Sequence, residues 1–451
     1  MNAQLIASTD LRLIVGLGAT GRSVARWWAR QGHRFIATDA SEALAADPQL
    51  QADIDPAHLH LGAIDGATLE QVTEAVVSPG VPMDDPVVAS LRARGCRIRG
   101  DVDVFMEQVA EPVVGITGSN GKSTVTSLLG EMLIACGVRA AVGGNLGPPA
   151  LELLGRGSEA YVLELSSFQL ERSESLGLEV ATVLNVTEDH LDRYSSLSQY
   201  HRAKHRIFSG ARRVVANRED PLTVPLLPDD VEVIWWRPSD PDLDEFGVRD
   251  IEGVSWICHG WRSLISADEL PLAGHHNLHN VLVALALGTA LDMPIEGLLE
   301  GVRRYRGLPH RCQRVAEIDA VLYVDDSKGT NIGATIAALK GLGTASSIWL
   351  ILGGQGKGQN FSLLKDSVAE HCAGVIVLGE AAADITAALA SFSPCHLVDS
   401  IEAAVALAAR SATPGQLVLL SPACASLDMF SSYVERGERF QTAVRALEAA
   451  A

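Results

Sequence analysis

The feature that most constrains the fold of this chain is a glycine-rich turn between an apolar stretch and a helical pattern, within residues 113–137. The apolar residues Val113, Val114 and Ile116 predict a buried strand. Leucine and methionine recur at helical spacing behind the turn, up to Gly137. The turn itself is Gly118-Ser119-Asn120-Gly121-Lys122-Ser123-Thr124. Strand, glycine-rich turn, Lys-Ser and helix together predict a phosphate-binding loop (P-loop) in an α/β sheet, where backbone N–H groups and a helix N-terminus face an anion.

This P-loop departs from the standard spacing at one position. A glycine is expected five residues before Gly121, where this chain has Ile116, and the first glycine of the turn is Gly118. In a P-loop, Lys122 would contact the β- and γ-phosphates and Ser123 would bind Mg²⁺. The alternative is a tight strand–helix turn with a solvated lysine. We favour the phosphate loop because the strand, the turn and the helix all agree with it.

Length, charge and cysteine usage limit the class of protein. A chain of 451 residues exceeds one ordinary core, so several domains are expected. The net charge of −19 argues against a nucleic-acid partner and requires that an anionic ligand be held by a local positive site. Seven scattered cysteines without a C-x-x-C pair are typical of reduced cytosolic thiols. With no apolar run of membrane-spanning length and no signal-type N-terminus, we expect a monomeric cytoplasmic protein without membrane contact.

The first hundred residues indicate a Rossmann-like domain. A strand at 11–15 leads into Gly16-Leu17-Gly18-Ala19-Thr20-Gly21, which has the G-x-G-x-x-G spacing, and a helix follows. The next strand, 35–38, delivers Asp39 to the place of a ribose-binding carboxylate, although Asp39 could equally cap the next segment. A further strand ends in the sharp turn Ser78-Pro79-Gly80. These alternating units predict a small parallel sheet in a domain of residues 1–100.

Residues 101–307 are expected to form a central P-loop domain around a parallel sheet. A predicted strand at 161–168 contains Glu164 among apolar neighbours, and a carboxylate there should be paired or should bind a metal. Another strand, 181–186, ends in a polar loop that should face the same crevice as the P-loop. The segment 142–149 is expected to be a loop after a short strand. Residues 214–272 are expected to be irregular, with short strands and no chemistry.

Several positions of this domain leave a plain interpretation open. His190 would by itself more often be a surface histidine. Lys204, in a helix predicted over 200–208, is on sequence alone a solvated lysine. Asn277 and Asn280 share one face at the start of an apolar helix, and Asn277 is equally compatible with a plain N-cap. The adjacent histidines 275 and 276 lack a second ligand pair at matching spacing, so we discount a metal site there.

Residues 308–451 predict a second Rossmann-like domain, with strands at 321–324, 347–352, 375–378 and 417–420. The strand ends carry Asp325–Lys328, Gly353–Gly358 and Ser421–Ser426, and these segments should gather on one rim of the sheet. The Gly-Lys segment is either a flexible linker or an anion site. Its position directly behind a buried strand favours the anion site.

Together, the three units suggest an enzyme that uses ATP to join ligands held by the outer domains. A bond-forming ligase fits better than a kinase, because a kinase needs only one acceptor site. An NAD-dependent dehydrogenase, argued from Gly16–Gly21 and Asp39, would leave the P-loop and the third domain unexplained. A non-catalytic nucleotide switch would not need the polar rim around Lys357 and Ser426.

The motifs also resemble a known family. T-G-S-N-G-K-S-T (117–124), L-E-L-S-S-F-Q-L (163–170), L-N-V-T-E-D-H-L-D-R-Y (184–194) and G-H-H-N (274–277) resemble the Mur ligases, the ATP-dependent amide ligases of peptidoglycan precursor synthesis. D-S-K-G-T-N (326–331), G-G-Q-G-K-G (353–358) and S-P-A-C-A-S-L-D-M-F (421–430) are similar to the members that add D-glutamate. The resemblance extends over nearly the whole chain.

The resemblance implies an activity and a set of catalytic groups. ATP would phosphorylate the terminal carboxylate of UDP-N-acetylmuramoyl-L-alanine, and the amine of D-glutamate would attack the acyl phosphate, with two Mg²⁺ ions bound. A Mur-type ligase for another amino acid is the alternative. Lys122, His190 and Lys204 would be catalytic, and a carbamylated Lys204 replaces the solvated interpretation. The metal ligands would be Ser123, Glu164, His190 and the Lys204 carbamate.

The same resemblance assigns the binding residues. ATP would be held by Gly118, Ser119, Asn120, Gly121, Lys122, Ser123, Thr124, Asn277, Asn280, Arg311 and Asp326. The UDP-linked substrate would be held by Gly18, Ala19, Thr20, Gly21, Asp39, Gly80 and Asn145, and D-glutamate by Lys328, Thr330, Lys357, Ser426 and Leu427. The chain departs from the family pattern at Asp325 and Gly329, and at Ala40 and Ser41, where relatives often place Thr-Arg against the uracil.

Overall fold

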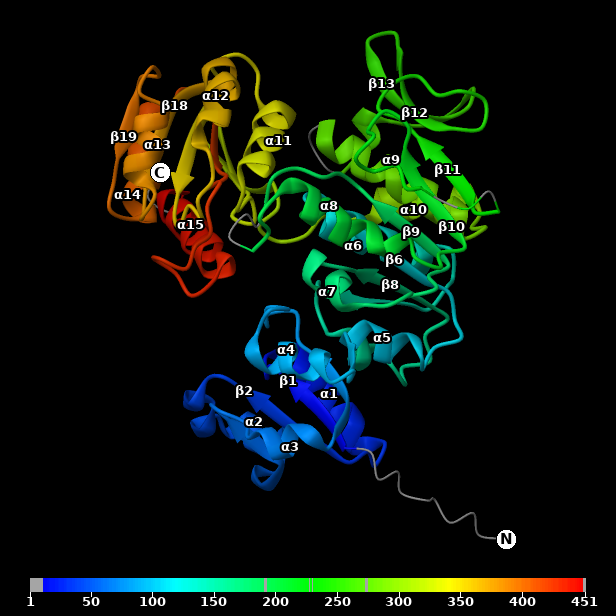
Figure 1. Ribbon diagram of the computed structural model, residues 1–451. Coiled ribbons are helices and arrows are strands. Elements are labelled where there is room, and N and C mark those ends of the chain that lie inside the picture. The colour runs from blue at the N-terminus through cyan, green and yellow to red at the C-terminus, as the bar shows by residue number, and fades with distance from the viewer. Residues whose placement is uncertain (1–10, 190–192, 227, 229, 272–274, 449–451) are drawn as a thin grey trace.

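The computed structural model describes residues 11–189, 193–226, 228, 230–271 and 275–448, and it confirms the α/β architecture of three domains (Figure 1). Each domain is built on its own sheet, and the three sheets follow one another along the chain. The limits predicted at residues 100 and 307 lie between sheets, since the first sheet ends at Arg99 and the third begins at Gln313. Within the described ranges, every helix is too short or too polar to span a membrane.

The first domain has five parallel strands in the order β3-β2-β1-β4-β5. The strands are β1 (Leu11–Val15), β2 (Phe35–Asp39), β3 (Leu59–Leu61), β4 (Val72–Val77) and β5 (Arg97–Arg99), and the helices are α1 (Ala19–Arg30), α2 (Pro48–Asp53), α3 (Gly66–Glu70) and α4 (Pro86–Ala93). Residues 13–15 are apolar and buried, because helices cover both faces of this parallel sheet. The turn from β1 to α1 requires glycine. Gly16 has a φ of +90°, and a Cβ on Gly21 would lie 1.9 Å from the carbonyl oxygen of Gly16.

The central domain has nine strands in the order β14-β13-β12-β11-β10-β9-β6-β8-β7. The strands are β6 (Val113–Thr117), β7 (Ala140–Gly144), β8 (Ala160–Glu164), β9 (Val180–Val183), β10 (Arg213–Asn217), β11 (Glu232–Trp236), β12 (Phe246–Ile251), β13 (Val254–His259) and β14 (Arg262–Ser266). The helices are α5 (Asp101–Met106), α6 (Lys122–Ala135), α7 (Ser167–Arg172), α8 (Leu197–His205), α9 (His275–Ala290) and α10 (Ile295–Arg304). Helices α6, α9 and α10 cover one face of the sheet, and α5, α7 and α8 cover the other.

Three expectations for this domain are wrong. The strand predicted over 161–168 ends at Glu164, and α7 begins at Ser167. Residues 214–272 are not irregular, because β12, β13 and β14 form antiparallel hairpins that make the sheet mixed at this edge. In the β12–β13 turn both residues have positive φ, 55° at Glu252 and 83° at Gly253, as a two-residue type I′ hairpin requires. Residues Val142–Gly144 belong to β7, so the loop expected over 142–149 begins only at Asn145.

The third domain has six strands in the order β15-β16-β20-β17-β18-β19. The four predicted strands are confirmed as β16 (Val321–Asp325), β17 (Ile348–Gly353), β18 (Cys372–Leu378) and β20 (Leu417–Leu420), whereas the edge strands β15 (Gln313–Ile318) and β19 (Cys395–Leu397) were not predicted. Helices α11 (Ile332–Leu342), α12 (Lys365–His371) and α13 (Ala382–Ala388) cover one face, and α14 (Ile401–Ser411) and α15 (Tyr433–Glu448) cover the other. Because β16, β20 and β17 are parallel neighbours, the segments 325–328, 421–426 and 353–358 gather as expected; we call them the third-domain rim.

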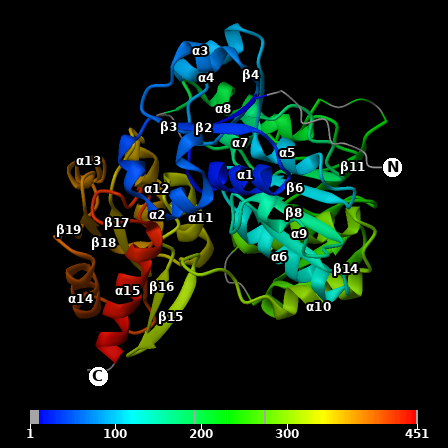
Figure 2. The same cartoon turned by 90° about the horizontal axis from the view of Figure 1, so that it is seen from below.

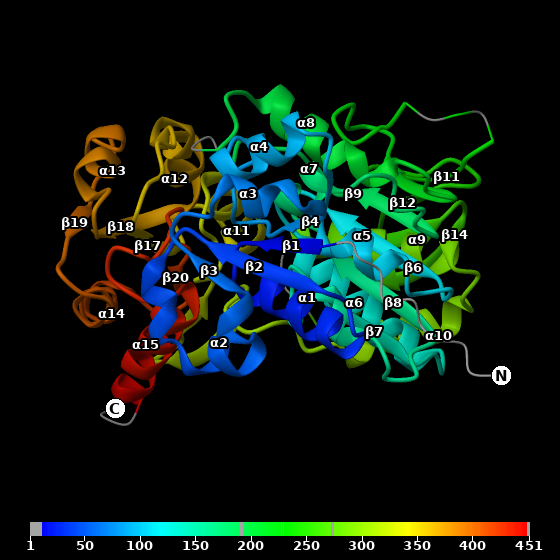
Figure 3. The same cartoon turned by 60° about the horizontal axis from the view of Figure 1, so that its bottom comes forward.

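Both outer domains contact the central domain. Helix α11 of the third domain packs against α9, so the two domains lie side by side (Figures 1 and 2). The first domain lies on the side of α5, which contacts α1 (Figure 3). The P-loop between β6 and α6 therefore lies in a domain flanked by both others.

Candidate active site

The P-loop is shaped by hydrogen bonds from the segment that follows β9. The Ser119 N–H donates to Asn185 O at 2.9 Å, and the Asn120 N–H donates to Asn185 Oδ1 at 2.8 Å. Ser119 Oγ donates to Thr187 O at 3.0 Å. The polar loop predicted at the end of this strand therefore lies against the P-loop and fixes its backbone, so that the loop is ordered before a ligand arrives.

Lys122 is the first residue of α6, as the P-loop prediction requires. Its Nζ donates to Gly118 O at 2.7 Å and to Ser119 O at 2.9 Å. Burial lowers the pKa of Lys122. The lysine before ligand binding is thus paired with backbone carbonyls, and its charge remains available to an anion in the loop.

A cavity of about 660 Å³ lies over the P-loop and is lined by both the central and the third domain. At its floor Ser123 Oγ donates to Glu164 Oε2 at 2.5 Å, and Asn145 Nδ2 donates to Glu164 Oε1 at 2.6 Å. Arg311 of the third domain donates from Nη2 to Ser123 Oγ at 2.5 Å. The structure therefore brings together four residues predicted from distant parts of the chain.

Lys204 is buried, so the interpretation as a solvated lysine is wrong. Its side chain is only 1% exposed, and Nζ donates to Gly118 O at 2.8 Å. Nζ also lies 4.4 Å from the centre of the Tyr200 ring, which lies one turn earlier on α8. Burial lowers the pKa of Lys204 well below its ordinary value, and the charge of Lys122 adds to this effect. Tyr200, which the sequence did not single out, accepts a hydrogen bond from Ser119 Oγ at 3.3 Å.

His190 lies outside the described residues, so its predicted role remains a prediction. Its neighbour Asp189 is described, and Asp189 Oδ2 accepts a hydrogen bond from Asn331 Nδ2 at 3.1 Å. The same Asn331 Nδ2 lies 3.4 Å from Asn120 Oδ1 in the P-loop. Asn331, the N-cap of α11, is thus a second link between the third domain and the P-loop that the sequence did not reveal.

The donors around Ser123 suit Mg²⁺ better than a soft metal. Glu164 is 2% exposed, and its oxygens are bonded by a hydroxyl and an amide rather than by a cation. Among the described residues there is no group of three or more His, Cys, Asp or Glu side chains that could hold a metal. Mg²⁺ beside phosphates commonly uses only one or two carboxylates and keeps several waters. One buried carboxylate beside the P-loop serine fits that requirement.

Aromatic and amide side chains from α9 and β11 also line the cavity, and Asn280 lies against Gly121 of the P-loop. Asn280 Nδ2 donates to Asn277 Oδ1 at 3.1 Å, which confirms that both lie on one face of α9. Asn277 lies inside the first turn of α9, so it is not a plain N-cap. The rings of Trp236 and His279 lie 6.3 Å apart. Trp236 is 4% exposed, and its Nε1 has no hydrogen-bond partner among the described residues.

The third-domain rim presents a buried acid, Asp326, and a half-buried base, Lys328. Asp326 Oδ2 accepts from Ser421 Oγ at 2.8 Å, and burial raises the pKa of Asp326 to about 7. Lys328 Nζ lies 3.9 Å from the centre of the Tyr433 ring. Burial, followed by the charge of Arg311, lowers the pKa of Lys328 to about 8. The rim thus holds a lysine whose charge depends on pH near neutrality.

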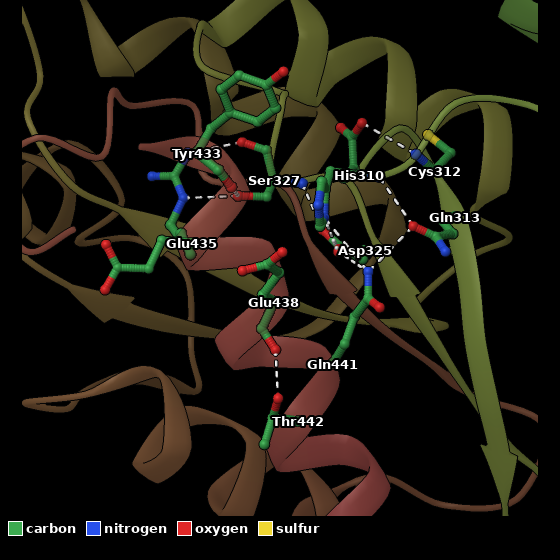
Figure 4. A network of polar contacts seen from close by, with 12 residues as sticks. His310, Cys312, Gln313, Asp325, Ser327, Tyr433, Glu435, Glu438, Gln441 and Thr442 are labelled. Atoms are coloured by element: carbon green, nitrogen blue, oxygen red, sulfur yellow. Dashed lines mark hydrogen bonds and ion pairs between the residues drawn. The ribbon is translucent and has the colours of Figure 1, made fainter. Parts of the chain in front are cut away.

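A hydrogen-bonded network behind the rim fixes residues 325–328 (Figure 4). His310 Nδ1 lies 2.7 Å from Asp325 Oδ2, and Gln441 Nε2 donates to the same oxygen at 2.8 Å. Arg436 is 2% exposed and donates from Nη2 to Ser327 O at 2.8 Å. None of His310, Arg436 and Gln441 was predicted. Arg436 and Gln441 belong to α15, and His310 lies before β15. From there they position the rim residues that face the cavity.

The first-domain loop is built as expected, but Asp39 has a structural task. Asp39 Oδ2 accepts from the Leu17 N–H at 2.8 Å, and Oδ1 accepts from the Ser41 N–H at 2.9 Å. Both oxygens thus cap backbone groups, as in the alternative left open by the sequence. Gly18 is exposed at the N-cap of α1, so the first turn of this helix is open to an anion.

Comparison with known proteins places these features in one family. Domain-family sequence models match three stretches: "Mur ligase MurD-like, N-terminal domain" at residues 10–100, "Mur ligase middle domain" at 116–288 and "Mur ligase, glutamate ligase domain" at 310–424. UDP-N-acetylmuramoylalanine–D-glutamate ligase of Pseudomonas aeruginosa is 46% identical over 98% of this chain and 99% of its own length. The ligase of that name from Marinobacter nauticus is 45% identical over 98% of this chain and 100% of its own.

The chain belongs to the Mur ligase family. Solved structures of Mur ligases and their relatives share its fold. A pseudomurein peptide ligase type C from Methanothermus fervidus aligns with a TM-score of 0.62 at 16% identity, covering 97% of this chain and 100% of that one. UDP-N-acetylmuramate-alanine ligase from Thermotoga maritima aligns with a TM-score of 0.60 at 16% identity, covering 98% and 100%.

The residues that the Mur ligase resemblance assigns are only partly united in this cavity. The lining includes Ser119, Asn120, Gly121, Lys122, Ser123, Thr124, Asn145, Glu164, Lys204, Asn277, Asn280, Arg311, Asp326, Lys328, Thr330 and Lys357. Ser426 and Leu427 do not line it; Ser426 is buried and Leu427 is 65% exposed. Gly18, Ala19, Thr20, Gly21, Asp39 and Gly80 belong to the first domain and lie apart from the cavity lining.

Proposed function

We propose that this Mur ligase joins D-glutamate to UDP-N-acetylmuramoyl-L-alanine at the expense of ATP. The observation that carries the proposal is the cavity shared by the P-loop and the third-domain rim, closed by the contact of Arg311 with Ser123. A phosphate donor and an amino acid could meet there. The similarity to the D-glutamate ligases of Pseudomonas aeruginosa and Marinobacter nauticus supports the same substrates.

The reaction would proceed in two balanced steps. A carboxylate oxygen of the precursor attacks the γ-phosphorus of ATP, the bond to the β,γ-bridging oxygen breaks, and ADP leaves. The D-glutamate amine then attacks the acyl carbon, inorganic phosphate leaves with its acyl oxygen, and the nitrogen loses a proton. Lys122 and Arg311 would offset charge that develops on the transferring phosphoryl group. Ser123, Glu164, His190 and carbamylated Lys204 would hold Mg²⁺, two ions in our proposal, which shields the phosphates when bound.

The cavity also suggests how the substrates are oriented. The triphosphate would lie on the P-loop, and the base would lie near Asn277, Asn280 and Trp236, whose Nε1 has no hydrogen-bond partner among the described residues. D-glutamate would be bound by Lys328, Thr330 and Lys357 on the rim, with Ser426 and Leu427 ordering that rim. In this proposal the enzyme acts as a monomer, with the cavity between its own central and third domains. ATP and the UDP-linked precursor are cytoplasmic metabolites, which fits a reaction in the cytoplasm.

The proposed substrates give the first prediction. Phosphate release from ATP should require both UDP-N-acetylmuramoyl-L-alanine and D-glutamate, because the acyl phosphate turns over only when an amine attacks it. A coupled phosphate assay with each substrate omitted in turn measures this. Turnover at an equal rate with L-glutamate, L-alanine or a diamino acid would contradict the assignment and favour a Mur ligase for another amino acid.

The lowered pKa of Lys328 gives the second prediction. Its amine is protonated below the pKa of about 8 and can then attract a carboxylate of D-glutamate; above that pH the charge is lost. The KM for D-glutamate should therefore rise as pH increases beyond 8, approaching about tenfold per pH unit. Lys328→Met should raise KM at pH 7 and remove the dependence. The measurement is KM from pH 6.5 to 9.5 at saturating ATP and precursor, and a flat profile in the wild type would refute the role.

A further inference from the structure

Two arginines of the central domain hold one turn of the first domain. The turn is Ser78–Val81, directly after β4. Arg172, the last residue of α7, donates from Nη1 to Pro79 O at 3.4 Å and from Nη2 to Val81 O at 2.6 Å. Arg193 donates from Nη1 to Gly80 O at 3.2 Å and from Nη2 to Val81 O at 2.9 Å. Three successive carbonyl groups of one domain are thus bound by two guanidinium groups of another.

These guanidinium groups bind few groups besides the turn; Arg172 Nη1 also donates to Phe168 O. Arg172 is only 3% exposed, and Arg193 is half-buried, with its guanidinium 4.7 Å from the centre of the Phe168 ring. Neither forms an ion pair with a carboxylate of the described residues. The carboxylates of Glu171 and Asp101 act on Arg172 without forming an ion pair, whereas its charge-assisted bonds to carbonyls are strong and directional. An arrangement of this kind is a poor source of stability and a good device for fixing a position.

The Ser78–Val81 turn also supports the G-x-G loop of the first domain. Ser78 Oγ donates to Gly16 O at 2.7 Å, and the Ser78 N–H donates to Val15 O at 2.8 Å. A Cβ on Gly16 would lie 2.6 Å from Val81 Cγ2, so the two loops are in tight contact. A displacement of the turn must therefore displace the loop that starts α1, where a phosphate of the UDP-linked substrate would bind.

Along the chain, both arginines lie close to segments that form the active site. Arg172 ends the helix whose N-cap, Ser166, comes two residues after Glu164. Arg193 follows the segment whose Thr187 holds Ser119 of the P-loop, since Ser119 Oγ donates to Thr187 O at 3.0 Å. Short stretches of chain thus connect the first-domain loop, through the two arginines, to the residues around the transferred phosphate.

We propose that Arg172 and Arg193 are positioning residues that set the first domain at a fixed place relative to the P-loop, so that the carboxylate of the UDP-linked precursor reaches the γ-phosphate. This inference rests on the proposed function for its chemical meaning. The precursor would be held at its diphosphate by the first domain and would react at its other end in the central domain. A misplacement of about 1 Å between such sites costs about a hundredfold in rate.

The test compares R172A, R193A and the double variant with R97A. Arg97 and Glu174 form an exposed ion pair across the same domain boundary, so R97A removes a contact between these domains without touching the turn. Because the proposal gives neither arginine a contact with the precursor, the Kd of the precursor without ATP should stay within about threefold, and kcat of the double variant should fall about a hundredfold. R193K, which keeps one donor and the charge, should recover part of kcat. R97A should match the wild type.

A second measurement does not depend on activity. Non-cysteine spin labels at Arg92 on α4 and Glu131 on α6, both exposed, report the distance between the two domains. This distance should have a narrow distribution in the wild type and in R97A, and a broadened or shifted one in the double variant. If the wild type formed no product, the proposed function would be wrong. The distances between the labels would still show whether the two arginines position the first domain. The inference would be overturned if the distance distribution of the double variant were the same as that of the wild type. It would also be overturned if a variant with a broadened distribution kept its full kcat. If Arg172→Ala fails to fold, R193A alone serves for both measurements.

Discussion

Replacing Lys204 by alanine is expected to lower kcat by about a hundred- to a thousandfold, the cost of removing one group that stabilises developing charge. The Nζ is buried and lies 2.8 Å from Gly118 O in the P-loop. Its lowered pKa increases the fraction of neutral amine at a given pH, and only the neutral amine adds to CO₂. In the proposed carbamylation the nitrogen would bond to the carbon of CO₂ and release a proton, which would leave a carbamate anion beside Gly118 of the P-loop.

The variants of Lys204 separate a carbamate from a simple ammonium. Short carboxylates such as acetate or propionate should partly restore K204A, because they return an anion to the cavity. Lys204→Arg keeps a cation but forms no carbamate, so it should stay inactive. Lys365→Ala, at an exposed position on α12, is the matched control and should keep wild-type kcat. Steady-state rates with and without added carboxylate measure the effect. Full activity of unsupplemented K204A, or rescue by alkylamines instead, would refute the carbamate role.

The P-loop could be predicted from the sequence because its determinants are local. Gly121 is followed directly by Lys122 and Ser123, and the flanking strand and helix are both rich in apolar residues. Local patterns cannot show which way a helical lysine points. Lys204 and Tyr200 lie one turn apart on α8, and only the packing of that helix against the sheet turns both toward the P-loop. The resemblance to Mur ligases, not the residue pattern, identified Lys204.

The groups that support the third-domain rim were missed for a different reason. His310 and Gln441 both contact Asp325, although they lie 131 residues apart in the sequence. Such contacts are created by the order of the strands and have no spacing signal. The β12–β13 hairpin was missed although Gly253 marks a possible turn. Both Glu252 and Gly253 adopt positive φ there, as a two-residue type I′ turn requires. The error there was one of turn chemistry rather than of long-range packing.

The two outer domains contact different parts of the active site. Arg311 and Asn331 bring the third domain to the P-loop, and Arg172 and Arg193 bring the first domain to the adjacent backbone. Lys122 lies in the same P-loop as Asn120 and Ser123, which the third domain contacts. Its Nζ donates to two carbonyls and can exchange them for phosphate oxygens without leaving its place.

Lys122→Met should therefore reduce kcat/KM for ATP by about a thousandfold, because methionine keeps the packing at the start of α6 but lacks the charge. The ammonium group contacts the β- and γ-phosphates in a P-loop, so ATP should lose more affinity than ADP. Calorimetric Kd values for the two nucleotides, together with steady-state rates, measure both effects. The melting temperature should remain close to that of the wild type, since the pKa of Lys122 is lowered by burial and the charge itself is costly in the ligand-free protein. Equal losses of ATP and ADP affinity would place Lys122 away from the γ-phosphate, and an unchanged kcat/KM would show that Arg311 alone provides the positive charge for the transfer.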